Sequence, residues 1–124
     1  RLNFLLGQGT TRRGEDDRFV ARVRSSNEVE NFLAPARSAA GGRSHLVLTR
    51  DRKGAERIWL NGKAVAERDA GGSLETWHDG LPLAIGNDPG EEARLWRGAC
   101  FFAAIYDRAL SAEEIEANHA WGTP

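Results

Sequence analysis

The carboxylates are the residues of this sequence with the greatest potential for chemistry, and their spacing decides what they can do. Glycoside hydrolysis needs two carboxyl groups that face one sugar ring, about 5–5.5 Å apart in a retaining enzyme, and two acids on one strand share a face only at alternate positions. The acidic runs lack that spacing: Glu15-Asp16-Asp17 are consecutive, Glu91-Glu92 fall in a predicted loop, and Glu113, Glu114 and Glu116 fall on the exterior of a predicted helix. We therefore expect that this chain is not an enzyme.

Histidine and cysteine offer metal-binding or nucleophilic chemistry only in particular settings. The three histidines, His45, His78 and His119, are isolated in the sequence, and none has a partner at metal-ligand spacing. We expect them to be surface or packing residues. The single cysteine, Cys100, excludes an internal disulfide and does not decide the redox compartment. It falls in an apolar stretch, so we expect a small buried residue without reactivity.

Two loops carry candidate ligand-binding residues. Asn87 and Asp88 offer the oxygen ligands that Ca²⁺ takes, close to two further carboxylates, although the same residues also fit a plain Asn-Asp turn before a proline. In the other loop, Trp77, His78 and Asp79 form the best exposed candidate for sugar stacking and hydrogen bonding. Most tryptophans in a small domain pack in the core, and the sequence leaves both alternatives open.

Length and composition limit the class of protein. The chain has 124 residues, which fits one domain, and its apolar fraction of 40% suffices for a core. A net charge of -1 provides no electrostatic footprint for nucleic acid or an anionic membrane, and no apolar run reaches the roughly 20 residues of a membrane span. The chain opens on Arg1 and contains no methionine, so we expect an excised or processed piece of a longer polypeptide.

Short apolar stretches separated by turn residues predict the elements that position these side chains. Alternation is clearest near the start, where Phe19, Ala21 and Val23 share one face. Asn61-Gly62 between two apolar runs predicts a hairpin with a type I′ turn. Ser111 and Glu114 form a predicted capping box, and Ile115 and Trp121 are expected to anchor the helix that follows. Strands are predicted at 3–6, 18–24, 44–50, 56–60, 63–67, 81–85 and 97–106, with a short helix from about residue 112.

Three segments, in order, resemble the laminin G-like domain of the concanavalin A-like lectin and glucanase superfamily. They are SHLVLTRDRKGAERIWLNGKAVAE (44–67), LPLAIGNDPG (81–90) and WRGACFFAAIYDRALSAEEIEA (96–117). The resemblance implies an all-β, antiparallel jelly-roll β-sandwich with a short C-terminal helix. It also implies that Ca²⁺ is a possible cofactor, since relatives often bind it at the rim of the sandwich. The sequence departs from many relatives in having no acid within 98–102.

Complete relatives begin with an apolar strand that has no counterpart here. We therefore interpret residues 1–124 as the C-terminal part of a single laminin G-like domain that lacks its first strands. Such a piece is expected to depend on strands from elsewhere and to aggregate when expressed alone, because open strand edges and uncovered apolar faces favour association.

Two functions are consistent with these features. The first is a non-catalytic recognition module of a larger exported bacterial protein, extracellular, at the cell surface or periplasmic, which binds carbohydrate or a protein surface. The second is a structural or assembly domain that packs against neighbouring domains or subunits and takes no small ligand. Sugar binding requires exposed aromatic residues beside polar groups, whereas assembly requires an extended apolar surface or open strand edges.

Overall fold

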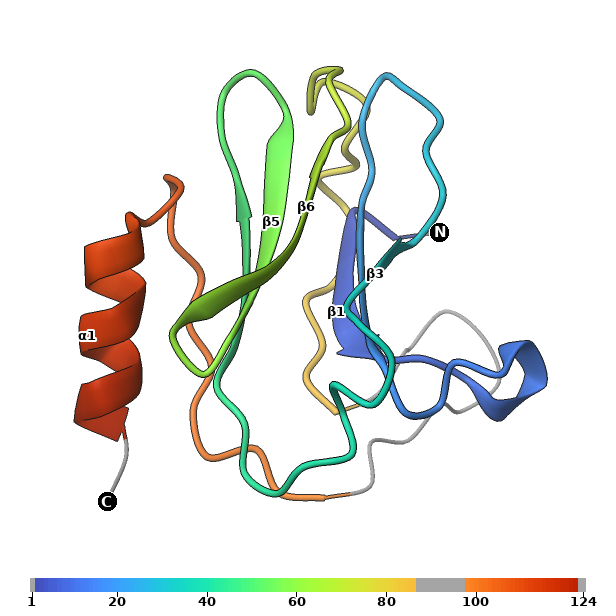
Figure 1. Ribbon diagram of the computed structural model, residues 1–124. Coiled ribbons are helices and arrows are strands. Elements are labelled where there is room, and N and C mark those ends of the chain that lie inside the picture. Colours follow the sequence, from blue (N-terminus) through green and yellow to red (C-terminus); the bar gives the residue numbers. More distant parts are fainter. Residues whose placement is uncertain (1, 87–97, 123–124) are drawn as a thin grey trace.

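Two small antiparallel sheets and one C-terminal helix are formed by the residues that the structure describes (Figure 1). The computed structural model describes residues 2–86 and 98–122. Helix α1 (Ala112–Gly122) packs beside the second sheet at the end of the molecule away from the first (Figure 1). No helix among the described residues is long and apolar enough to cross a membrane. The two antiparallel sheets and the helix confirm the predicted all-β sandwich with a short C-terminal helix.

The first sheet contains β1 (Phe4–Gln8), β2 (Phe19–Val23) and β3 (Phe32–Leu33), in that order. A 3-10 turn, η1 (Thr11–Arg13), lies in the connection between β1 and β2. The predicted alternation in β2 is confirmed, because Phe19, Ala21 and Val23 are all buried and Arg22 between them is exposed. Val20 is buried as well, so β2 is covered on both faces in part of its length.

The second sheet contains β4 (Leu46–Arg50), β5 (Ala55–Leu60) and β6 (Lys63–Asp69), with β5 in the centre. The Asn61-Gly62 hairpin joins β5 to β6, and both residues have positive φ, 52° and 85°. These values are those of a type I′ turn, which confirms the prediction. Ile58 and Trp59 are consecutive on β5 and therefore project to opposite faces of the sheet, which places them in separate hydrophobic clusters.

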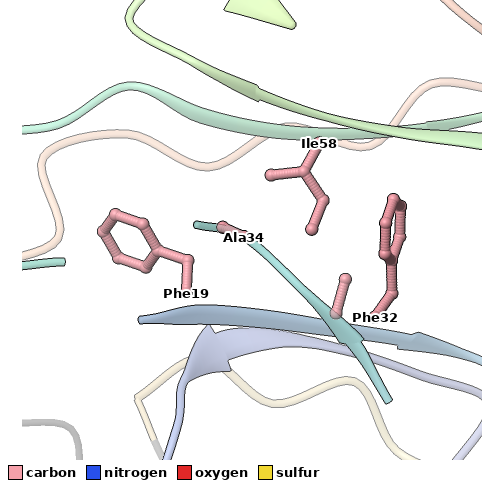
Figure 2. Packing of buried hydrophobic residues seen from close by; sticks show 5 residues of the cluster. Phe19, Phe32, Ala34 and Ile58 are labelled. Carbon is pink, nitrogen blue, oxygen red and sulfur yellow. The ribbon is translucent and has the colours of Figure 1, made fainter. Parts of the chain in front are cut away.

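The core lies between the two sheets. Its buried members are Phe19, Ala21, Phe32, Ala34 and Ile58, and Figure 2 shows Ile58 reaching from the second sheet toward the phenylalanines of the first. A second cluster contains Trp59, Leu110 and Ile115, with Val47 packed against it. This second cluster attaches α1 to the second sheet, so the strands of that sheet have apolar contacts on both faces.

Helix α1 begins at the predicted capping box. The Ser111 amide donates to Glu114 Oε1 at 3.0 Å, and the Glu114 amide donates to Ser111 Oγ at 3.2 Å. Ile115 is fully buried and anchors the helix as predicted. The expected anchoring role of Trp121 is wrong, since its exposed fraction is 92%.

Two predicted strands are absent. Residues 81–86 and 98–106 form no strand, and the expected strands at 81–85 and 97–106 are wrong in the described residues. Their apolar side chains are exposed instead, and Cys100, predicted to be buried, is exposed with them. The physical reason is that an alternating apolar pattern forms a strand only when a neighbouring strand takes up its backbone hydrogen bonds, and the described strands do not do so here.

Candidate functional site

The loop with the predicted ligand-binding residues is anchored to the first sheet. The Trp77 indole N–H donates to the Arg24 carbonyl at 2.6 Å, and its ring stacks on Phe4 with centroids 5.8 Å apart. The His78 amide donates to Asn3 Oδ1 at 2.9 Å. The side chains of His78 and Asp79 are exposed, whereas Trp77 is half-buried. Ligand binding by Trp77, His78 and Asp79 stays a prediction, with only two of the three side chains fully presented to solvent.

The predicted calcium ligands cannot be placed. Asn87 and Asp88 lie outside the described residues. Within residues 2–86 and 98–122, no group of three His, Cys, Asp or Glu side chains is arranged to hold a metal ion. Calcium binding by Asn87 and Asp88 stays a prediction.

A shallow polar depression of about 410 Å³ lies beside η1 and the first sheet. It is lined by Arg13, Glu15, Arg22, Val29, Glu30, Asn31 and Leu33. Guanidinium, carboxylate and amide groups at one site can form hydrogen bonds to several hydroxyls at once. No pattern in the sequence groups these residues, because the arginines fit an ordinary solvated face and the acids and the amide come from other segments.

Two histidines that are far apart in the sequence meet in the structure. The rings of His45 and His119 stack with centroids 5.7 Å apart, which joins the start of β4 to α1. Partial burial, and then the nearby charge of His119, lower the pKa of His45. The two histidines are far apart in the sequence and meet because α1 docks beside the start of β4, a contact that no short-range spacing could predict.

A buried ion triad joins the second sheet to the loops around it. Glu56 is 1% exposed and accepts from Arg50 and Arg68, each at 2.9 Å. Arg50 also donates to the carbonyls of Gly71 and Gly72. Arg68 donates to the Glu30 carbonyl at 2.6 Å and lies over a phenylalanine ring of the first sheet. All these partners belong to the protein itself, so the triad is structural and Glu56 is not available as an acid or base toward a ligand.

An exposed apolar segment covers residues 101–106, with the sequence FFAAIY; we call it the apolar strip. The exposed fractions are 71% for Phe101, 73% for Phe102 and 66% for Ile105, and Tyr106 is half exposed. Side chains of this type are ordinarily found in a core. Leu83 and Ile85, in the other segment that was predicted as a strand, are similarly exposed.

The two sheets and the C-terminal helix define a β-sandwich module. The family model described as the concanavalin A-like lectin/glucanases superfamily, Laminin_G_3, matches residues 4–116, and the chain belongs to this family. The predicted laminin G-like assignment is thereby confirmed. Laminin G-like domains are generally not enzymes. Among curated protein sequences, none matches this chain.

One similar solved structure is the segment of residues 221–444 of an S-layer domain-containing protein from Clostridium thermocellum. The identity is 19%, the TM-score is 0.55, and the match covers 84% of this chain and 52% of that one. The likeness extends to the fold alone. This chain spans about half the length of that solved structure.

Proposed function

We propose that this chain is a non-catalytic structural or assembly module, which packs against neighbouring polypeptide of an exported or cell-surface protein. The observation that carries the proposal is the exposure of the apolar strip, residues 101–106. With aromatic side chains of about 150–250 Å² each, its four large residues expose on the order of 500 Å². The largest apolar patch on a monomeric soluble protein is typically about 300–600 Å² and often takes part in binding, and the strip reaches that size.

The charged residues support a role without catalysis. Glu56 is held by two arginines, and Glu114 is paired with Arg108 at 2.5 Å. Hydrolysis of a sugar would instead need two carboxyl groups facing one ring. The membership in a lectin-type family and the fold shared with part of an S-layer domain-containing protein support an extracellular or surface location.

The test is site-specific photocross-linking in the natural polypeptide that carries residues 1–124. The photoreactive residue p-benzoylphenylalanine replaces Phe102 in one variant and Lys53, an exposed residue in the β4–β5 turn, in the control. We expect polypeptide cross-links from position 102 and far fewer from position 53. Equal yields at the two positions, or no polypeptide adduct at position 102, would contradict the proposal.

Carbohydrate recognition is the second candidate function, and the polar depression is the observation that favours it. Arg13 and Arg22 line the depression, and neither guanidinium forms an ion pair within the described part of the chain. Glu30 and Asn31 at the same site add hydrogen-bond acceptors and donors. Free guanidinium groups favour an anionic sugar.

The experiment for this candidate is binding to an array of neutral and uronic-acid glycans. Arg22→Ala tests the depression, and His78→Ala together with Asp79→Ala tests the loop predicted from sequence. Loss of binding in only one of these variants identifies the site. Retention in all of them, or no binding by the unaltered chain, removes the carbohydrate hypothesis. Calorimetry with Ca²⁺ at millimolar concentration tests Asn87 and Asp88 separately.

A further inference from the structure

Helix α1 is attached to the second sheet through few contacts. Ile115 is the buried residue of the helix, and it packs with Trp59 and Leu110. Farther along, the helix lies against the tip of the β5–β6 hairpin, where a Cβ built on Gly62 would be 3.4 Å from the His119 ring. One buried side chain provides little apolar area. A change of charge at the second contact can therefore decide whether α1 stays docked.

His45 faces this second contact from the start of β4. Its ring stacks on His119, with centroids 5.7 Å apart and planes inclined by 30°. The backbone of His45 is fixed to the hairpin, because its amide donates to Asn61 Oδ1 at 2.9 Å and its carbonyl accepts from the Asn61 amide at 2.8 Å. His45 therefore cannot withdraw from α1 without breaking these hydrogen bonds.

The docked arrangement has no place for a charged His45. A neutral imidazole has one N–H donor and one acceptor, whereas both nitrogens of the charged form are donors. The Nδ1 atom of His45 is buried and has no hydrogen-bond partner. Protonation would therefore bury an unpaired polar group or a charge beside a second imidazole. Burial, and then the charge of His119, lower the pKa of His45, which is the direction expected when docking opposes protonation.

The other charged groups near the contact do not offset this effect. Glu116 lies one turn before His119, with its backbone against the hairpin tip, but its side chain is exposed and its attraction is screened by water. Lys63, directly after the hairpin turn, adds a positive charge. Arg43 lies over an aromatic ring of the apolar strip. The last turn of a helix favours a cation, so His119 can hold its proton and the repulsion falls on His45.

From this arrangement we propose that the contact between His45 and His119 is an acid-sensitive switch. When both imidazoles carry a proton, α1 detaches from the second sheet and uncovers Val47 and Trp59, while the two sheets stay folded. The core between the sheets and the buried ion triad contain no histidine, so nothing in them titrates over the same pH range. The switch needs no partner and is independent of the proposed assembly function.

Amide hydrogen exchange tests the switch in the natural polypeptide that carries residues 1–124. Each exchange rate is divided by the unfolded rate at the same pH, which removes the pH dependence of the exchange chemistry. The comparison runs from about pH 7.5 to about pH 5, across the ordinary histidine pKa of about 6.5. Protection of α1 should fall on the order of tenfold, because two charges 5.7 Å apart repel and salt screens only part of that repulsion. Protection of β5 should stay unchanged.

Oxidation by hydroxyl radicals provides a second measurement, which reports the uncovered surface. Trp59 is 6% exposed when α1 is docked, so its oxidation should rise as the pH falls. Trp77 serves as the internal reference, because its indole is hydrogen-bonded to the first sheet and should not respond. Peptide mass spectrometry distinguishes the two positions.

Three variants assign the effect to the two imidazoles. His45→Gln and His119→Gln each remove one of the two charges, so protection of α1 should become nearly independent of pH in both. His78→Gln alters an exposed histidine of the 74–80 loop and should keep the full response. Protection of β5 at about pH 7.5 shows whether a variant is folded, and either of the first two variants is sufficient for the test.

The outcomes separate a local switch from general acid unfolding. If α1 and β5 lose protection together, or if α1 loses none, the switch is refuted. A loss that persists in His45→Gln and His119→Gln has the same consequence. Cross-linking from Phe102 tests the assembly function on a different part of the chain, so each of the two proposals can fail while the other stands.

Discussion

The buried ion triad provides the sharpest test of what holds the second sheet together. Glu56 on β5 is the shared acceptor of Arg50 on β4 and Arg68 on β6, so a single carboxylate links all three strands of the second sheet. The substitution Glu56→Gln removes the charge and nearly preserves the shape. Arg68 also reaches the Glu30 carbonyl, so the perturbation extends to the chain just before β3.

The magnitude follows from burial. Side-chain exposure is 1% for Glu56, 10% for Arg50 and 21% for Arg68. Removing one partner of a buried ion pair costs about 3–5 kcal/mol, because the remaining charge stays buried without compensation. Because Arg68 is partly accessible to water, we expect Glu56→Gln to cost about 3 kcal/mol of the free energy of unfolding, the lower end of this range. That loss is a large fraction of the roughly 5–15 kcal/mol that stabilises a small domain.

The chain contains a matched control on the same strands. Arg57 on β5 and Glu67 on β6 form an ion pair of 3.1 Å, with side chains 53% and 71% exposed. Glu67→Gln should cost about 0–1 kcal/mol. The assay is urea unfolding of soluble protein, followed by the fluorescence of the tryptophans. If Glu56→Gln lowers the free energy of unfolding by no more than Glu67→Gln does, the argument from burial is refuted.

The attachment of α1 leads to three further predictions. Ile115→Ala should lower the free energy of unfolding by about 2–5 kcal/mol, measured by urea unfolding, because Ile115 is fully buried. The pKa of His45 is lowered in the folded state, so the unfolded chain binds protons more readily, and stability should be complete above about pH 6.5 and fall as the pH falls below it. Thermal unfolding measured over a series of pH values should show this loss. His45→Gln should remove the part of the pH dependence of stability that comes from His45. The hydrogen bond from Arg108, followed by that from the Ser111 amide, lowers the pKa of Glu114 to about 2. The contribution of Glu114 to the start of α1 should therefore be present above about pH 4.5 and lost between pH 4.5 and 2, as measured by the helix signal in circular dichroism. An identical pH profile in Arg108→Ala would contradict this prediction.

Local rules predicted those parts of the fold whose causes are local. The turn at Asn61-Gly62 depends on two adjacent residues that accept positive φ, and the start of α1 depends on side chains three positions apart. Both were predictable because the residues that form the contact are close in sequence. Burial of β2 was predictable for the same reason, since alternation is a property of one strand.

The errors concern contacts between distant residues. Residues 81–85 and 101–106 have the composition of strands, but a strand exists only with a partner, and composition does not say whether that partner is at hand. The stacking of His45 on His119 and the two arginines on Glu56 likewise follow from docking and register. A search for short-range ligand spacing could not find them, because their members lie on separate elements.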